Sequence, residues 1–296
     1  MSDKHVSGSI SLISPELWPG VNAPRDPLGH KGTFGSVCIV GGASGMTGAA
    51  LLAGRSALKA GAGRVYVCLA QPNPEITVDL LQPELMLRHA EELPALASQM
   101  DALAVGCGLG RQPFAIDLLR SLIMTPQRCP MVIDADALNA LATGVFQPQW
   151  DPDKVVLTPH PAEAARLLDM TTAEIQRDRT SSIRKLADRY YAWIILKGHA
   201  SLVCSPSGDV FQNPTGDVAL ATAGTGDVLT GLIASLLGQG HSMQSAVCAG
   251  VWLHGAAGQY LRTQLGGPVG TTASEVIEAI RYLRNHPQWQ PPRQLA

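Results

Sequence analysis

Residues 221–227, which read Ala-Thr-Ala-Gly-Thr-Gly-Asp, are the part of the chain whose types and spacing most directly predict chemistry. Leucine or isoleucine follows at positions 229, 232, 233, 236 and 237, so Gly224 to Asp227 should begin an amphipathic helix. The free N–H groups and the dipole at a helix N-terminus attract anions, and two glycines let a phosphate or a developing oxyanion approach the backbone closely. The segment therefore predicts an anion hole beside the carboxylate of Asp227, although that Asp could instead only cap the helix.

A second glycine-rich segment, Gly106-Cys107-Gly108-Leu109-Gly110, follows an apolar strand. Its spacing does not match the dinucleotide-binding fingerprint, so it could be either a ligand loop or a tight turn. The chain has no Gly-Lys dipeptide and hence no P-loop, and it has neither a Gly-x-Ser-x-Gly elbow nor a His-Glu-x-x-His zinc motif. These absences exclude P-loop phosphoryl transfer, nucleophile-elbow hydrolysis and zincin chemistry.

The elements that must position these segments alternate between strand and helix. Short apolar runs predict strands, and the stretches between them predict helices, so we expect an α/β fold with a largely parallel sheet covered on both faces. The mixed charges of the helix expected over residues 172–189 indicate a solvated face. The expected strands are 36–41, 64–69, 102–106, 131–134, 155–158 and 192–197, with a hairpin of 202–204 and 210–212, and the expected helices are 47–60, 114–124, 136–142 and 172–189.

Composition narrows the function classes. The 296 residues are 46% hydrophobic and only 16% charged, with a net charge of -2 and no block of like charges. A surface that binds nucleic acid or acidic lipid normally has a basic bias, so neither partner is expected. No repeat or composition break divides the chain, which predicts a single domain over 1–296 with its core at about 24–283 and a loose Pro/Gln-rich tail at 287–296.

Residues 228–261 contain no Asp, Glu, Lys or Arg, which raises the question of a membrane segment. The polar and glycine residues at 238–242 divide this stretch into pieces shorter than a membrane span, so we expect two buried core helices. The six cysteines form no Cys-x-x-Cys pair, which predicts buried thiols in a reducing compartment rather than a zinc site. No secretory signal is visible, and a cytoplasmic location without a membrane contact is expected.

Six segments, taken in order along the chain, resemble the ADP/ATP-dependent NAD(P)H-hydrate dehydratases of the ribokinase-like superfamily. The resemblance covers roughly residues 24–283, and it implies the ribokinase-like fold. Larger members of the family also carry an epimerase domain, for which the short N-terminal segment has no room, so the stand-alone dehydratase is expected. The segments are His30-Lys31-Gly32-Thr33-Phe34-Gly35, residues 41–54 with Met46-Thr47-Gly48-Ala49, residues 106–110, Asp134-Ala135-Asp136-Ala137-Leu138-Asn139, residues 157–163 with His160-Pro161-Ala162-Glu163, and Asn213-Pro214-Thr215-Gly216 leading into residues 224–227.

The resemblance implies an enzyme that repairs hydrated NADH or NADPH. The hydroxyl on the nicotinamide ring would accept a phosphoryl group from ADP, giving AMP, and would then leave as phosphate. Gly224, Thr225 and Gly226 would form the anion hole, while Asp227 would bind the substrate hydroxyl and accept its proton. The family also implies a homo-oligomer such as a tetramer, acting with a separate NAD(P)H-hydrate epimerase.

The remaining roles follow from the same resemblance. Residues Lys197, Gly198, His199, Ala200 and Ser201, with Gly226, would bind ADP and AMP, although Lys197 could be only an exposed residue at a strand end. Ala49, Gly108 and His160 would contact the hydrated cofactor, although an isolated histidine is usually structural. Glu163 would organise Mg²⁺ indirectly, through its waters, or would be only a first-turn glutamate.

Three acidic or amide residues, Asp134, Asp136 and Asn139, could line the site or cap the following helix, and the cap is favoured for Asp136. The chain departs from its relatives at Ala223, Asp217 and Cys107, where Gly, Asn and Pro are usual. The negative charge of Asp217 would discourage a more highly phosphorylated nucleotide, which agrees with ADP as the donor. Two other classes stay open, a small-molecule kinase of the same fold that uses ATP and a nucleotide-binding subunit without activity.

Overall fold

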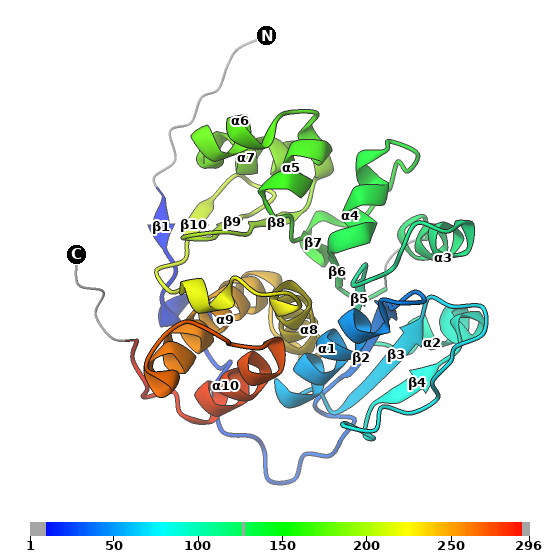
Figure 1. The fold of residues 1–296 in the computed structure, drawn as a ribbon, viewed down its shortest axis with the longest axis horizontal. Coiled ribbons are helices and arrows are strands. Elements are labelled where there is room, and N and C mark those ends of the chain that lie inside the picture. Colours follow the sequence, from blue (N-terminus) through cyan, green and yellow to red (C-terminus); the bar gives the residue numbers. More distant parts are fainter. Residues whose placement is uncertain (1–9, 126–127, 292–296) are drawn as a thin grey trace.

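A ten-stranded, mostly parallel sheet runs through the computed structural model, which describes residues 10–125 and 128–291 (Figure 1). Among the described strands, only β9 runs antiparallel to its neighbours, β8 and β10. Across the sheet the strands are β1 (Ser11–Leu12), β10 (Val210–Gln212), β9 (Leu202–Cys204), β8 (Trp193–Leu196), β7 (Val155–Leu157), β6 (Met131–Ile133), β5 (Ala102–Val105), β2 (Ser36–Gly41), β3 (Arg64–Leu69) and β4 (Met86–Arg88).

The central strands are apolar throughout because both faces of the sheet are covered. In β2, Val37 and Ile39 join one hydrophobic cluster, and Cys38 and Val40 join another on the opposite face. Successive side chains of a strand point to opposite faces, so a strand buried on both sides reads as an unbroken apolar run. The predicted strands are therefore confirmed, with ends that differ by at most one residue, and so is the hairpin of β9 and β10.

One face is covered by α1 (Thr47–Lys59), α8 (Thr225–Gly238), α9 (Met243–Leu265) and α10 (Ala273–Asn285) (Figure 1). Both α8 and α9 are largely buried, as the uncharged stretch predicts. A Cβ atom at Gly231 would lie 2.0 Å from the carbonyl oxygen of Ala53, so α8 crosses α1 in backbone contact. This contact, two turns from the start of α8, sets where the glycine-rich turn lies.

The other face is covered by α2 (Leu93–Ala97), α3 (Pro113–Ile123), α4 (Ala135–Ala142), α5 (Pro161–Leu168), α6 (Thr172–Arg177) and α7 (Arg179–Tyr190). The single helix expected over 172–189 is wrong, because Asp178 leaves the helical region with φ at -141°. Its carboxylate accepts a hydrogen bond from the N–H of Ser181 at 2.9 Å and so begins α7. Strands β1 and β4, both three residues or shorter, were not predicted.

The N-terminal segment contributes to the core ahead of the expected start at 24. Ile13, Trp18 and Val21 are buried in the cluster beneath α8 and α9. At the other end, Trp289 packs on Tyr260 with ring centroids 6.0 Å apart, and the expected tail lies outside the described residues from 292 onward. All six cysteines are free and buried. Within the described ranges, no helix is long and apolar enough to cross a membrane.

Five neighbouring strands, β8, β7, β6, β5 and β2, are parallel and therefore end at one edge of the sheet. Chain order reverses between β5 and β2, and crevices at such reversals are the usual ligand sites of open α/β sheets. The predicted site segments follow these strands directly: Gly42 follows β2, Gly106 follows β5, Asp134 follows β6, Thr158 follows β7 and Lys197 follows β8.

Candidate active site

A buried ion pair joins two of these strand ends. The ammonium of Lys197 lies 2.7 Å from Oδ1 of Asp134, and the hydroxyl of Thr230 on α8 donates to Oδ2 of the same carboxylate at 2.7 Å. Burial alone would raise the pKa of Asp134, but Lys197 and Thr230 outweigh it and hold that pKa below its usual value. Asp134 is thus a charged carboxylate that fixes Lys197, and although it is the N-cap residue of α4, its side chain makes no cap bond.

The Lys197 ammonium is aimed at the start of α8. A Cβ atom built on Gly226 would lie 3.4 Å from Nζ of Lys197. Although burial disfavours the ammonium, Asp134 and Glu163 raise the pKa of Lys197, so it stays positively charged. The alternative of an exposed lysine at a strand end is therefore wrong, because this side chain is only 18% exposed.

The glycine-rich turn begins α8 as predicted. Gly224 is the N-cap residue with φ at 89°, which a residue with a Cβ rarely adopts, and it packs against Leu52 and Ala273. The Thr225 hydroxyl is turned inward and donates to the carbonyl oxygens of Leu220 and Thr222 at 2.9 and 3.1 Å. With its hydroxyl engaged, Thr225 offers the site its backbone. The turn therefore presents N–H groups beside the Lys197 ammonium.

Asp227 lies in the first turn of α8, but it is not the cap residue of that helix. The cap residue is Gly224, which has no side chain with which to cap the helix. Burial raises the pKa of Asp227 to about 6, and a hydrogen bond from the Cys107 thiol partly opposes that rise. Burial also raises the pKa of the Cys107 thiol well above its usual value, so the thiol stays protonated and can donate. A carboxylate with a pKa near neutrality suits proton transfer. The contact with Cys107 was not predicted, although the sequence marks this position as unusual.

Ala49 and Gly108, which were predicted to contact the substrate, lie against each other. A Cβ atom at Gly108 would be 3.0 Å from the Cβ of Ala49 and 2.7 Å from the carbonyl oxygen of Met46. The carboxylate of Asp136 accepts a hydrogen bond from the N–H of Gly110 at 2.9 Å. The expectation that Asp136 caps α4 is therefore wrong, because it fixes the 106–110 loop. Asn139 accepts from Arg166 at 2.8 Å and likewise is not a cap.

His160 and Glu163 form a capping box at the start of α5. The Nδ1 atom of His160 accepts from the N–H groups of Ala162 and Glu163, and Glu163 accepts from the N–H of His160 at 2.8 Å. Burial raises the pKa of Glu163 to about 6, and one of its oxygens lies 4.0 Å from Nζ of Lys197. Both residues thus have the structural role that was the alternative for each, and Glu163 also borders the Lys197 ammonium.

The expected nucleotide loop, 197–201, is held by a residue that was assigned to a solvated face. The guanidinium of Arg179 donates to the carbonyl oxygens of His199 at 3.0 Å, Leu196 at 3.0 Å and Lys197 at 3.4 Å. Gly198 and Ala200 have positive φ angles, 134° and 49°. Arg179 is the first residue of α7, and nothing in its sequence context distinguishes it from the other charged residues of that helix.

The negative charge of Asp217 is largely neutralised. Arg262 lies 3.1 Å from its carboxylate, which also accepts from the N–H of Ala219 at 2.9 Å. The expectation that this charge discourages a more highly phosphorylated nucleotide is therefore not supported by its surroundings. The methyl group of Ala223 is exposed at the rim of the turn.

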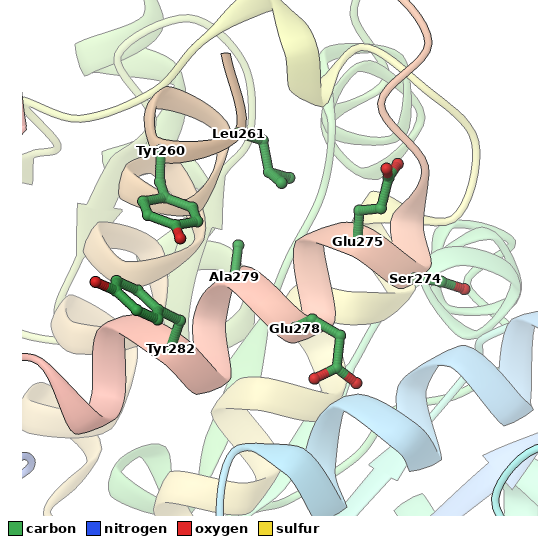
Figure 2. Close-up of a pocket in the computed structure, with 7 residues that line it drawn as sticks. All are labelled: Tyr260, Leu261, Ser274, Glu275, Glu278, Ala279 and Tyr282. Atoms are coloured by element: carbon green, nitrogen blue, oxygen red, sulfur yellow. The ribbon is translucent and has the colours of Figure 1, made fainter. Parts of the chain in front are cut away.

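A separate pocket of about 370 Å³ lies between α9 and α10 (Figure 2). Tyr260 and Tyr282 stack on each other at one side of it with ring centroids 4.8 Å apart, and Glu278 pairs with Lys59 at 3.1 Å. None of the predicted site residues lines this pocket. Its lining residues are Tyr260, Leu261, Ser274, Glu275, Glu278, Ala279 and Tyr282.

The sequence model of the NAD(P)H-hydrate dehydratase family matches residues 37–281. The chain belongs to this family. An ADP-dependent (S)-NAD(P)H-hydrate dehydratase of Neisseria meningitidis is 43% identical over 286 residues, which cover 95% of this chain and 96% of the relative. A bifunctional NAD(P)H-hydrate repair enzyme of Moorella thermoacetica is 42% identical over 88% of this chain, but over only 51% of its own length.

Among solved structures, the ADP/ATP-dependent NAD(P)H-hydrate dehydratase of Bacillus subtilis, co-crystallised with ATP and Mg²⁺, has a TM-score of 0.79. It is 31% identical, and the likeness covers 94% of this chain and 99% of that one. The predicted ribokinase-like α/β fold is thereby confirmed. Because the chain belongs to the NAD(P)H-hydrate dehydratase family, the cluster of Asp134, Lys197 and Asp227 can be interpreted in terms of the chemistry of that family.

Proposed function

We propose that this protein dehydrates hydrated NADH and NADPH, using ADP as the phosphoryl donor and releasing AMP and phosphate. The observation that carries the proposal is the position of the Lys197 ammonium, held by Asp134 beside Gly226 at the start of α8. A cation and free N–H groups meet there, next to a carboxylate that can accept a proton. The ADP-dependent activity named for the Neisseria relative supports this assignment.

The residues divide the reaction between them. The N–H groups of Gly224, Thr225 and Gly226, with the Lys197 ammonium, stabilise the negative charge on the transferred phosphoryl group. Asp227 orients the ring hydroxyl and accepts its proton as the new O–P bond forms and the bond to AMP breaks. The ring nitrogen's electrons then expel phosphate, and the neighbouring ring carbon loses a proton to restore the dihydronicotinamide. Asp227 is the group placed for the first proton transfer.

Ala49 and Gly108 are proposed to pack against the hydrated ring, because a larger side chain at either position would fill the space between their loops. His160, with about half of its side chain exposed, is proposed to contact the same ring. The backbone of residues 197–201 is proposed to hold the adenine nucleotide, in the conformation that Arg179 supports.

Magnesium fits this site as a companion of the nucleotide. The carboxylates of Asp134 and Glu163 lie 2.7 and 4.0 Å from the single ammonium, and Asp227 also interacts with it electrostatically, so an anionic nucleotide needs a further cation there. Within the described ranges, no group of three His, Cys, Asp or Glu side chains is arranged to hold a metal ion. Mg²⁺ usually keeps several waters and takes phosphate oxygens, so Glu163 would act on those waters. The ion supplies charge neutralisation on the phosphates when bound.

The broader setting is also proposed. Six buried, free cysteines are consistent with a reducing compartment such as the cytoplasm. The bifunctional relative joins two repair activities in one chain, which supports cooperation with an NAD(P)H-hydrate epimerase. We further propose that the protein forms a homo-oligomer such as a tetramer, which sedimentation at working concentration would test.

The test is a product assay. The protein is incubated with hydrated NADH and either ADP or ATP, and recovery of the reduced-nicotinamide absorbance is followed together with release of AMP. Recovery that depends on a nucleotide is the expected result. Transfer of phosphate to an added vitamin-like alcohol without recovery of NADH would identify a kinase instead. Nucleotide binding without any product would identify a subunit without activity.

A further inference from the structure

His254 of α9, which lies outside all the motifs named above, contacts the backbone of the glycine-rich turn at the start of α8. Its Nε2 atom lies 2.9 Å from the carbonyl oxygen of Thr225, the first residue of α8. A carbonyl oxygen can only accept, so the contact requires a proton on Nε2. His254 therefore donates a hydrogen bond into the turn that begins α8.

The receiving carbonyl belongs to the peptide unit that joins Thr225 to Gly226. In a planar trans peptide, the C=O of one residue and the N–H of the next point in opposite directions. Fixing the Thr225 carbonyl therefore also fixes the direction of the Gly226 N–H, and a Cβ atom built on Gly226 would lie 3.4 Å from Nζ of Lys197. Hydrogen bonds in series polarise one another, so donation to the carbonyl also makes that N–H a stronger donor.

The Thr225 hydroxyl donates to the carbonyl oxygens of Leu220 and Thr222, which fixes its side chain. The Thr225 carbonyl oxygen, in contrast, receives its contact from another helix, through His254 of α9. The position of His254 is itself fixed by the Asn-Pro-Thr-Gly segment. The side chain of Asn213 donates to the carbonyl oxygen of Val251 at 3.0 Å, and the hydroxyl of Thr215 donates to that of Trp252 at 2.8 Å.

Close packing completes this support. A Cβ atom at Gly255 would lie 2.3 Å from the Thr215 hydroxyl, so the turn of α9 that carries His254 is pressed onto the segment. The imidazole also stays neutral, because burial lowers its pKa to about 4 and Lys197 acts in the same direction. A single, permanent donor thus faces the Thr225 carbonyl throughout the neutral pH range.

We propose that His254 is a positioning residue for the dehydratase reaction, which orients and polarises the Thr225–Gly226 peptide so that the Gly226 N–H faces the transferred phosphoryl group. The inference rests on the proposed role of the turn as an anion hole. His254 touches neither substrate nor nucleotide in this arrangement. Its contribution should therefore appear in the chemical step and only weakly in binding.

The experiment compares His254→Leu, which removes the donor at similar volume, with His254→Gln, whose amide nitrogen can reach the same carbonyl. We expect His254→Leu to lower kcat about 10- to 100-fold, with KM for hydrated NADH changed less than about 3-fold. His254→Gln should restore kcat to within about 3-fold of wild type. His241→Leu, the same chemical change beyond the far end of α8, is the matched control and should leave kcat unchanged.

Thermal unfolding of each variant shows whether it is folded. Wild-type kcat in folded His254→Leu, or equal losses in folded Leu and Gln variants, would overturn the proposal. Should His254→Leu not fold, nitrogen NMR of the wild-type imidazole decides, because a proton on Nδ1 in place of Nε2 contradicts donation to Thr225. Turnover by the wild-type protein is measured in every series. Absence of wild-type turnover would contradict the proposed function, whereas the comparison of the variants with an active wild type tests the role of His254.

Discussion

Asp134 and Lys197 lie 2.7 Å apart although 63 positions separate them in the chain, and the pair connects the ends of β6 and β8. The strand between them, β7, pairs with both. The ammonium is therefore held across a whole strand, with Thr230 of α8 as the second partner of the carboxylate. Sheet and helix are joined at the point where the phosphoryl group is proposed to lie.

Asp134→Asn should destabilise the fold, because it leaves a buried ammonium without its carboxylate. Loss of one partner of a buried pair typically costs about 3–5 kcal/mol, and the nearby Glu163 should keep the loss at the lower end. Denaturant unfolding measures the effect. Asp117→Asn breaks an exposed ion pair and is the control, with an expected change below about 1 kcal/mol. Equal effects of the two substitutions would contradict a buried, charged Asp134.

Lys197→Ala should weaken ADP binding more than binding of hydrated NADH, because the ammonium faces the proposed phosphate position. Calorimetric titration with each ligand measures the two affinities. The double variant Lys197→Met with Asp134→Asn removes the pair without leaving an unpaired charge, so it should recover stability but not ADP affinity. An unchanged ADP affinity in both variants would separate Lys197 from the nucleotide.

Asp227→Asn should lower kcat by about 10² to 10⁴, the usual contribution of a general base, while leaving ADP affinity nearly intact. The amide can still orient the hydroxyl but cannot accept its proton. Steady-state rates and calorimetric binding measure the two quantities. A variant with substantial residual activity would exclude Asp227 as the base.

The pH profile should follow the ionisation of Asp227. Its pKa is raised to about 6, so kcat should fall as the pH decreases through about 6 and the carboxylate becomes protonated. Because the native state binds this proton more tightly than the unfolded chain does, its stabilising contribution is full below about pH 4 and is lost as the pH rises through about 6. Rate measurements between pH 5 and 8 locate the transition.

Cys107→Ala should move the same transition to higher pH, since it removes the thiol that donates to Asp227 and lowers its pKa. Cys107→Ser keeps a donor and should leave the transition near or below its wild-type position. Thermal unfolding of both variants checks that each is folded under the conditions of the rate measurements. A transition that does not move in Cys107→Ala would show that the thiol has no influence on the base.

ADP should be preferred to ATP, with AMP as the product. Residues 224–226 form one compact turn, and if it holds the β-phosphate, the γ-phosphate of ATP would occupy the place of the ring hydroxyl. Arg262, the nearest cation along the chain after Lys197, is engaged with Asp217. Values of kcat/KM for the two nucleotides measure the preference, and a higher value for ATP with accumulation of ADP would contradict it.

The sequence predicted the strands and the segments that directly follow them, and because parallel strands end at one edge, these segments gather there. It could not predict which side chains meet there. The pairing of Asp134 with Lys197 depends on the pairing of β6, β7 and β8, and its bond to Thr230 depends on the position of α8, which Gly231 packs against Ala53 of α1. His254 and Arg179 were missed for a related reason, since each acts on a backbone carbonyl and needs no characteristic neighbour in sequence.

The support that Arg179 gives to residues 197–201, the proposed nucleotide loop, bears on the kinetics of nucleotide capture. A loop whose carbonyl groups are already satisfied loses little conformational entropy when a ligand arrives. Association should then be limited by collision and orientation and not by a slow ordering step, so the observed rate should rise linearly with nucleotide concentration. Affinity would be controlled mainly by the dissociation rate, so AMP, which lacks the phosphoryl group that ADP has transferred, would leave quickly.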